Sequence, residues 1–325
     1  MAIRSPPRLA WAPGDSGLVS YRDRLVQLHD ANGRATRELA SERIYDVRFC
    51  DDGKIIALDD RGSVTFKRDG ELVAQTHFRL GDLVQSPHAA SMSANGERYV
   101  AISERDVFVV QLVGGEKPER IWTLHAKSYG VGLGDGRLVG REPSRVGIEM
   151  SPDGRLVAIG YIGGGRAWIV IEVETDQFLQ RADSRADPPK VVGRVAAPQL
   201  FAFDHAGVRL AHAVPDRVQS WGVTRLESDE REMAKTVPGG ALAVALDRGG
   251  LLAAYAYKDR LEGARGRLRI DYLSPAETGP ATVETIDTLS IEPDLPDIIA
   301  LAFSRDSRQL ACLASTGAIE IVPVP

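Results

Sequence analysis

The sequence has few of the residues that build metal sites and disulfide scaffolds. Only two cysteines occur among its 325 residues, Cys50 and Cys312, and they lie far apart and outside any metal-ligand spacing. We therefore expect two buried thiols in a reducing compartment rather than a disulfide framework. The six histidines are scattered without a His-x-x-His or His-Glu-x-x-His pair, so neither a metal nor another cofactor is predicted.

Long apolar runs and an excess of basic residues are missing as well. No segment reaches the roughly 18 consecutive apolar residues of a membrane helix, and the N-terminus lacks the apolar stretch of a secretory signal. A net charge of −5 argues against a dedicated nucleic-acid binder. We expect a cytoplasmic protein with neither a nucleic-acid partner nor a membrane partner. Only seven of the 40 basic residues are lysine, which together with abundant Ala and Gly indicates a high-GC, bacterial genome.

Helical periodicity is also lacking, since no 3.6-residue period is sustained over about 12 residues. What the sequence does contain is a unit that returns along the whole chain. Each copy has a short apolar run, a polar turn rich in Asp and Gly, a second apolar run, a gap and a third, alternating run. The clearest copy comprises the runs 146–150, 156–160 and 167–171 and the turn 151–154.

Seven copies of this unit can be aligned, the first of them loosely. Their turns end near residues 17, 53, 96, 154, 207, 250 and 307, a mean spacing of about 48 residues. Each unit therefore has room for a fourth strand, and four short antiparallel strands in roughly 40–50 residues are typical of a propeller blade. Fourth strands are predicted at 34–39, 71–76, 120–125, 177–181, 230–236 and 281–288.

These repeats predict an all-β fold, a seven-bladed β-propeller of four-stranded antiparallel blades in a single domain, 1–325. Asp-Gly and Asn-Gly pairs favour tight hairpins, and the apolar first runs suit inner strands covered on both faces. The seventh unit ends on its third strand, so we expect the ring to be closed by a short N-terminal strand at 2–4. The blades are predicted at about 8–40, 41–77, 86–126, 144–182, 198–237, 240–289 and 297–325 plus 1–5.

A turn at Met150–Gly154 is followed by a Leu-Val-Ala-Ile-Gly run at 156–160. A similar turn sequence occurs at 303–306. This combination resembles the WD40 and WD40-like propeller repeats over essentially the whole chain. No unit ends its third strand in Trp-Asp, the nearest sequences being 28–30 and 220–222, and no unit opens with Gly-His. The resemblance implies a degenerate bacterial WD40-like propeller, and it implies little about function because such propellers serve many roles.

Long loops are predicted at one rim of the propeller, where fourth strands lead to the next blade and second strands lead to third strands. They span 127–145, 182–197, 258–267 and 290–297, longer than the usual hairpin connections of roughly 2–5 residues. Because binding is often grafted onto such loops, we predict that one or more protein partners bind this rim of blades 3–7. The candidate partner-binding residues are Tyr129, Arg137, Arg141, Arg185, Lys258, Arg260, Glu262, Arg265, Arg267 and Asp294.

Other polar features are predicted to be structural. The glycine-rich segment 130–136 lacks both the spacing and the following helix of a nucleotide loop, which favours a plain loop. His212 lies in an apolar strand and is predicted to be a packed core histidine. The turn carboxylates recur with the repeat, so each is expected to cap its own hairpin; they are Asp52, Asp153, Asp204 and Asp247.

Two functional hypotheses follow. The leading one is a non-catalytic protein–protein interaction scaffold, or a regulatory or inhibitory subunit, of a bacterial multiprotein system, with no catalytic residue. The alternative is a propeller hydrolase, lactonase-like or glycosidase-like, acting at the channel mouth. It requires His, Asp or Glu side chains that converge with a metal on the axis, and the inner strands offer only His88 and Glu149.

Overall fold

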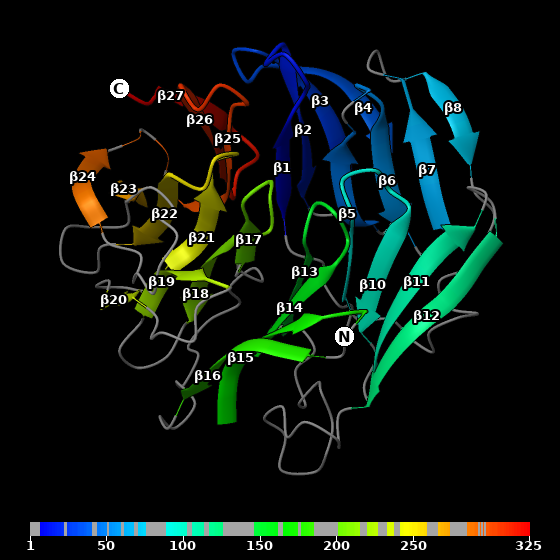
Figure 1. Ribbon diagram of the computed structural model, residues 1–325. Coiled ribbons are helices and arrows are strands. Elements are labelled where there is room, and N and C mark those ends of the chain that lie inside the picture. The colour runs from blue at the N-terminus through cyan, green and yellow to red at the C-terminus, as the bar shows by residue number, and fades with distance from the viewer. Residues whose placement is uncertain are drawn as a thin grey trace.

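The structure is a computed structural model, and its described residues form 27 strands in seven antiparallel sheets, six with four strands and one with three. The described part contains no α-helix, as predicted. Figure 1 shows the sheets following one another in chain order around a common centre. The described residues are 7–22, 25–40, 44–50, 52–59, 62–67, 71–75, 89–102, 106–113, 117–125, 146–161, 165–174, 177–184, 201–214, 220–226, 233–236, 241–258, 266–273, 285–291, 293, 295 and 297–325.

In each sheet, consecutive strands pair in chain order. The first sheet comprises β1 (Arg8–Trp11), β2 (Gly17–Arg22), β3 (Leu25–Asp30) and β4 (Ala35–Ala40). The second comprises β5 (Ile44–Phe49), β6 (Ile55–Asp59), β7 (Gly62–Phe66) and β8 (Leu72–Gln75). The third comprises β9 (Ala89–Met92), β10 (Arg98–Ile102), β11 (Asp106–Val113) and β12 (Lys117–His125). The fourth comprises β13 (Val146–Met150), β14 (Leu156–Tyr161), β15 (Gly165–Glu172) and β16 (Gln177–Ser184).

The remaining sheets follow the same plan. The fifth comprises β17 (Phe201–Phe203), β18 (Arg209–Val214), β19 (Ser220–Arg225) and β20 (Met233–Thr236). The sixth comprises β21 (Ala241–Leu246), β22 (Leu252–Lys258), β23 (Gly266–Leu273) and β24 (Thr285–Ile291). The seventh comprises β25 (Ile298–Phe303), β26 (Gln309–Ala314) and β27 (Ile319–Pro323). Each of the six predicted fourth strands overlaps an observed one, and the loosely matched first repeat forms a full four-stranded sheet.

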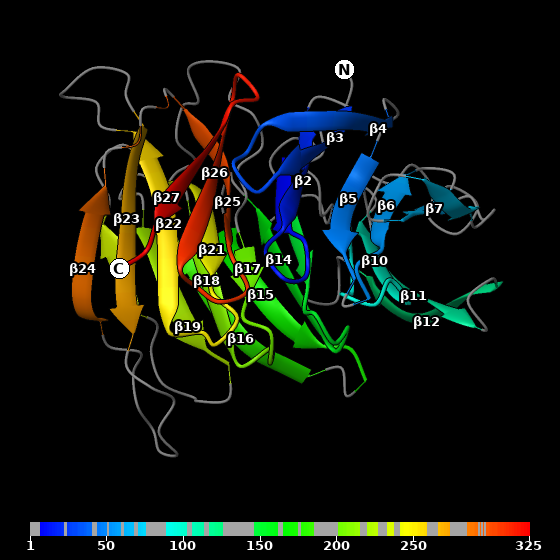
Figure 2. The same ribbon diagram turned by 90° about the horizontal axis from the view of Figure 1, so that it is seen from above.

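The first strands of successive sheets contact one another. The contacts run from β1 through β5, β9, β13, β17 and β21 to β25, and β25 in turn contacts β1. Figure 2 shows the seventh sheet, in red, beside the first, in blue. Between these two sheets the indole Nε1 of Trp11 donates a hydrogen bond to the carbonyl oxygen of Ala302 (2.9 Å). Among the described residues β27 pairs only with β26, and the predicted closing strand at 2–4 lies outside them.

The apolar core is divided into clusters that lie between neighbouring sheets rather than in one central mass. A cluster between the sixth and seventh sheets, for example, joins Leu268 and Ile270 to Leu301 and Leu310. The first and seventh sheets share a cluster as well; its buried members are Leu9, Trp11, Leu18, Ala300, Ala311 and Leu313. The sixth sheet, for example, buries one face against the fifth and the other against the seventh. Burying apolar surface in this way drives the sheets to stack around the centre.

Tight turns join the first strand of each sheet to the second, as the Asp-Gly pattern predicts. The fourth residue of the turn has a positive φ, which glycine adopts without strain. Gly154 has a φ of 76°, for example, and in the seventh sheet the same position is Ser307 with a φ of 61°. The repeated glycine is therefore set by the backbone conformation of the hairpin.

Three polar or sulfur-bearing side chains predicted to be internal are buried. Cys50 and Cys312 are free thiols inside the protein. His212 is 1% exposed and lies on β18 opposite Phe201 of β17 and Gly222 of β19. Burial lowers the pKa of His212 to about 3.

The burial of His212 predicts a pH-dependent stability. Between pH 6.5 and 3 the unfolded chain binds a proton on this histidine that the folded chain does not, so stability rises with pH. Lowering the pH from 7 to 5 should therefore cost about 2 kcal/mol through this group. Urea unfolding of the His212→Gln variant across this range should show a correspondingly flatter dependence of unfolding free energy on pH.

A control must separate titration from simple loss of packing. Leu210→Ala lies two residues away on β18, at a position that is 0% exposed. This variant should lower the unfolding free energy by about 2–5 kcal/mol while it keeps the wild-type pH slope. A His212→Gln variant with the same slope as the wild type would contradict the prediction.

Candidate functional site

The turns between first and second strands share a pattern of hydrogen bonds. In the fourth sheet, Ser151 Oγ donates to Asp153 Oδ1 (2.6 Å) and accepts the backbone N–H of Leu156 (2.9 Å). In the fifth and sixth sheets an aspartate replaces the serine. Asp204 and Asp247 each accept two backbone N–H groups of their own hairpin on Oδ1. The predicted capping role of the turn carboxylates is thus confirmed at these positions, and Asp52 likewise accepts the N–H of Lys54 (3.0 Å).

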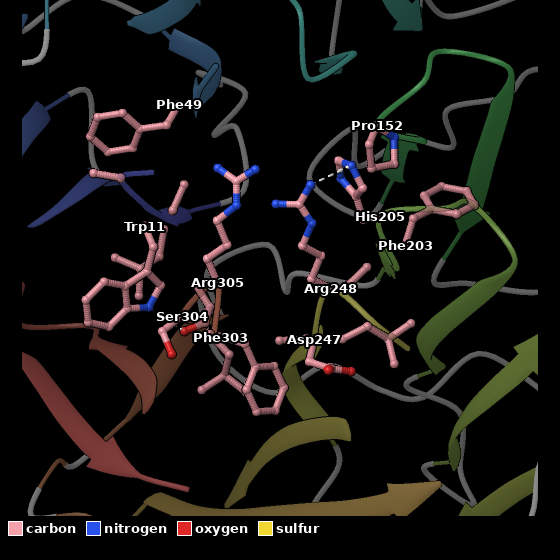
Figure 3. A pocket seen from close by; sticks show the side chains of 18 of the residues that line it. Trp11, Phe49, Pro152, Phe203, His205, Asp247, Arg248, Phe303, Ser304 and Arg305 are labelled. Carbon is pink, nitrogen blue, oxygen red and sulfur yellow. Dashed lines mark hydrogen bonds between the residues drawn. The ribbon is translucent and has the colours of Figure 1, made fainter. Parts of the chain in front are cut away.

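A cavity of about 310 Å³ lies where these turns meet, and we call it the turn-end pocket. Its walls come from six of the seven sheets, the third excepted among the described lining residues. Figure 3 shows aromatic and basic side chains around it. The aromatic members are Trp11, Phe49, Phe203 and Phe303, and the basic members are His205, Arg248 and Arg305.

The aromatic side chains occupy one repeated position. Trp11, Phe49, Phe203 and Phe303 are the last residues of β1, β5, β17 and β25. The three phenylalanines are partly exposed, whereas Trp11 is 8% exposed. The ends of the first strands therefore give the pocket an apolar wall that is built on paired strands.

The basic side chains also occupy one repeated position, the second residue of the turn. Arg248 Nη2 lies 3.1 Å from His205 Nε2. A guanidinium carries only donors, so His205 Nε2 is the acceptor in this contact. Figure 3 shows Arg248 and Arg305 extending into the same space. Their backbones are anchored too: His205 N donates to the carbonyl of Arg248 (3.3 Å), and Arg305 N donates to Asp15 Oδ1 (2.7 Å).

The carboxylate that lines the pocket is bonded to groups of two turns. Among the described lining residues the acidic one is Asp247. Its Oδ1 accepts the N–H groups of Leu251 (2.7 Å) and Leu252 (2.8 Å), and its Oδ2 accepts Gly249 N (3.3 Å) and Ser307 Oγ (2.9 Å). Asp247 therefore holds two turns together.

A second polar assembly, which we call the ion cluster, joins the same first strands and consists of Arg8, Asp46, Arg48 and Glu149. Arg8 Nη1 donates to Glu149 Oε2 (2.5 Å), and Arg8 Nε forms an ion pair with Asp46 Oδ1 at 3.1 Å. Arg48 bonds both carboxylates, through Nε to Asp46 Oδ2 (3.0 Å) and through Nη2 to Glu149 Oε1. Ser91 of β9 accepts from Arg48 Nη2 (3.0 Å) and donates to Asp46 Oδ2 (3.2 Å). Four first strands, β1, β5, β9 and β13, are thereby connected.

The ion cluster is buried and its formal charges balance. The side chains of Arg8, Asp46 and Glu149 are 8%, 1% and 10% exposed. Burial by itself would raise the pKa of Asp46, but the guanidinium groups of Arg48 and Arg8 hold it below its usual value. Glu149, one of the two side chains considered for a hydrolase, is therefore bonded to two arginines, and His88 lies outside the described residues.

Of the predicted partner-binding residues, the structure describes Lys258 and Arg267. They lie at the end of the β22–β23 hairpin, where Lys258 pairs with Gly266 and Tyr257 pairs with Arg267. Because β22 begins next to the turn that carries Arg248, these residues lie at the opposite end of the sixth sheet from the turn-end pocket. The others lie outside the described residues; they are Tyr129, Arg137, Arg141, Arg185, Arg260, Glu262, Arg265 and Asp294.

The residues of the turn-end pocket did have a signal in the sequence. Three consecutive repeats carry His205, Arg248 and Arg305 directly after the first turn residue. The same alignment places an aromatic residue at the end of several first runs. Neither regularity predicts a pocket until the turns are known to converge, because each residue taken alone is an ordinary exposed turn residue or strand end.

Neither a metal-ligand group nor a long apolar helix occurs in the part of the chain that the structure describes. There, no group of three or more His, Cys, Asp and Glu side chains is placed to hold a metal ion. Nor does this part contain a helix with the length and apolar character needed to cross a membrane.

Comparison with known proteins identifies the fold. No protein-family model and no curated protein matches the sequence. Among solved structures, the Cps50 (Swd1) β-propeller domain of Myceliophteria thermophila is similar with a TM-score of 0.62 and 14% identity, covering 100% of this chain and 98% of that chain. Hydrazine synthase of Kuenenia stuttgartiensis is similar with a TM-score of 0.62 and 11% identity, covering 100% and 97%. The chain thus has a β-propeller fold, and identities this low carry no conclusion about its activity.

The buried charges predict a large difference between two carboxylate substitutions. Asp46→Asn leaves Arg8 and Arg48 buried with only Glu149 to balance them, and removing one member of a buried ion pair costs about 3–5 kcal/mol. Glu71→Gln breaks the exposed pair with Lys67, which should cost less than about 1 kcal/mol. Urea unfolding of both variants measures the difference, and equal stabilities would contradict a supporting role for the ion cluster.

Proposed function

We propose that this chain is a non-catalytic protein-interaction scaffold, or a regulatory or inhibitory subunit, in a bacterial cytoplasmic multiprotein assembly. The observation that carries the proposal is the turn-end pocket, where aromatic and arginine side chains converge on rigid strand ends. Aromatic and arginine side chains placed in pockets are the usual anchors of protein–protein interfaces. A β-propeller presents such a surface without needing any catalytic group.

In this proposal, the ends of the sheets that lie opposite the turn-end pocket form a second contact surface. Lys258 and Arg267 lie there on the β22–β23 hairpin, at the two ends of the segment 258–267 that is predicted to contact a partner. A scaffold with two separate surfaces can hold two partners, or two parts of one partner, at a fixed distance. We therefore keep the loop-rich rim of the third to seventh sheets as a second, independent contact surface.

The proposal includes a specific architecture, a degenerate WD40-like propeller of seven blades closed into a ring. The contact of β25 with β1 supports it, as do the hydrogen bond from Trp11 to Ala302 and the one from Arg305 to Asp15. In this architecture residues 2–4 pair with β27 and complete the seventh blade. The strand is short, so the side-chain and turn contacts between the first and seventh sheets carry much of the closure.

The proposed function predicts that the protein co-purifies with a defined partner. The tagged chain, isolated from its native host and also co-expressed with the products of neighbouring genes, should yield a stoichiometric complex. The double variant Lys258→Gln/Arg267→Gln changes the loop-rich rim, and Arg248→Gln/Arg305→Gln changes the turn-end pocket. Each double variant removes two positive charges. At least one pair should weaken the complex by about tenfold or more. Absence of any partner, together with bound divalent metal and lactone or glycoside hydrolysis, would contradict the proposal.

The proposed closure predicts that the N-terminal residues stabilise the folded chain. Deletion of Met1–Pro6 should lower the midpoint of thermal unfolding by several degrees, because β27 loses a partner strand. Ile3→Pro should have a similar effect, since proline cannot donate a hydrogen bond within a sheet. Pro6→Ala serves as the control and should leave the midpoint within about one degree. Unchanged melting of both the deletion and Ile3→Pro would exclude this closing strand.

A further inference from the structure

The turn-end pocket has aromatic rings on several sides. Phe49, Phe203 and Phe303 end their strands and are partly exposed. Each of these side chains also packs against a buried apolar cluster, so its ring is supported from within the protein. Figure 3 shows the three rings on different sides of the Arg248 side chain. The rings therefore offer aromatic surface that an apolar group entering the pocket would bury.

Small side chains contribute to the size of the cavity. An alanine precedes the aromatic residue at the ends of β1, β17 and β25, and these three alanines, Ala10, Ala202 and Ala302, line the cavity. A larger side chain at any of these positions would occupy part of it. The volume of about 310 Å³ is at the lower end of the roughly 300–1,000 Å³ of small-molecule sites. The space therefore suits one large side chain of a partner better than a helix or a strand.

Arg248 favours an aromatic occupant over an aliphatic one. Its guanidinium donates to His205 Nε2 (3.1 Å), and a donor of this kind lies in the guanidinium plane, which leaves the two faces of the plane for stacking. The backbone N–H of His205 donates to the Arg248 carbonyl oxygen (3.3 Å), so both residues stand on linked turns. The electron-rich face of an aromatic ring complements a cation within about 6 Å. In-plane hydrogen bonds and face contacts use different directions, so stacking does not require a guanidinium without a counter-charge.

A second copy of this chain fits the pocket less well than a different protein does. In the described part of the chain, the large apolar side chains that are exposed are aliphatic, namely Leu72, Val73 and Leu251. An aliphatic side chain has no π face to place against Arg248. A ring that belongs to a different protein matches both the phenylalanines and the cation, and it agrees with the proposed interaction function.

We infer that the turn-end pocket binds one aromatic side chain of a partner protein. The ring packs among the three phenylalanines and stacks on the guanidinium of Arg248. This inference rests on the proposed interaction function and names the group by which the partner is anchored. The loop-rich rim does not share this specificity, because Lys258 and Arg267 lie at the other end of the sixth sheet.

Selection from a random-peptide phage library on the immobilised full chain tests this inference, with the Phe203→Leu/Phe303→Leu variant as a parallel target. This variant keeps apolar side chains and removes two of the rings. Peptides enriched on the wild type but not on the variant should share a Trp, Phe or Tyr. Synthetic copies should lose about tenfold or more in affinity when that residue is changed to Leu. Their affinity should change by less than about twofold between about 0.1 M and about 0.5 M NaCl, because the anchor is not an ion pair.

Matched single variants locate the binding. Arg248→Gln should weaken the selected peptides by about fivefold or more, because the stacked cation is lost. Lys258→Gln removes the same charge at the opposite end of the sixth sheet and should bind them like the wild type. Arg248 is exposed, so its substitution should leave the melting midpoint within about two degrees, which circular dichroism checks.

Four results would overturn the inference. They are the absence of any peptide that distinguishes the wild type from Phe203→Leu/Phe303→Leu, selected peptides without an aromatic residue, equal binding by Arg248→Gln and Lys258→Gln, and self-association of the wild type that Phe203→Leu/Phe303→Leu abolishes.

The inference and the proposed function can fail separately. If a native partner co-purifies equally well with wild type and with Phe203→Leu/Phe303→Leu, the interaction function stands and the aromatic-anchor inference fails. If aromatic peptides bind the pocket but no protein co-purifies from the native host, the pocket chemistry stands and the scaffold function fails.

Discussion

The arrangement of the first strands depends on the buried ion cluster. Arg8 and Arg48 bridge the carboxylates of Asp46 and Glu149, and these four residues come from β1, β5 and β13, while Ser91 brings in β9. Charges buried to this degree persist only when each has its counter-charge in place. The cluster therefore requires the sheets to meet in one order and at one distance, a condition that apolar contacts alone do not impose.

Apolar packing holds neighbouring sheets together, and the ion cluster fixes how those sheets are oriented. Clusters of buried side chains lie between neighbouring sheets, including the first and the seventh, so the first sheet is packed against both the second and the seventh. Such packing tolerates small rotations of one sheet against the next. Directional contacts remove that freedom: the bond from Trp11 to Ala302, the bond from Arg305 to Asp15 and the ion cluster itself. The strand ends are consequently held in register with one another, and the pocket is built on those ends.

The local parts of this fold could be predicted from the sequence, because their causes are local. The turn at Ser151–Gly154 needs only a capping side chain and a glycine at positive φ, and its recurrence revealed the repeat. The ion cluster could not be predicted, since Arg8 and Glu149 are 141 positions apart and meet only once the sheets surround a centre. The turn-end pocket lies between these cases. Arg248 and Arg305 stand at equivalent positions of aligned repeats, but their convergence follows from the order of the sheets.

The two sets of arginines differ in burial. In the ion cluster the guanidinium groups of Arg8 and Arg48 face two carboxylates of the same chain, so an external anion would have to displace an ion pair that is already formed and buried. In the turn-end pocket Arg248 and Arg305 are exposed, and the carboxylate of Asp247 is turned to its own hairpin and to Ser307. Burial therefore commits the arginines of the ion cluster to the fold, whereas the exposure of Arg248 and Arg305 leaves them on the surface of the proposed interaction site.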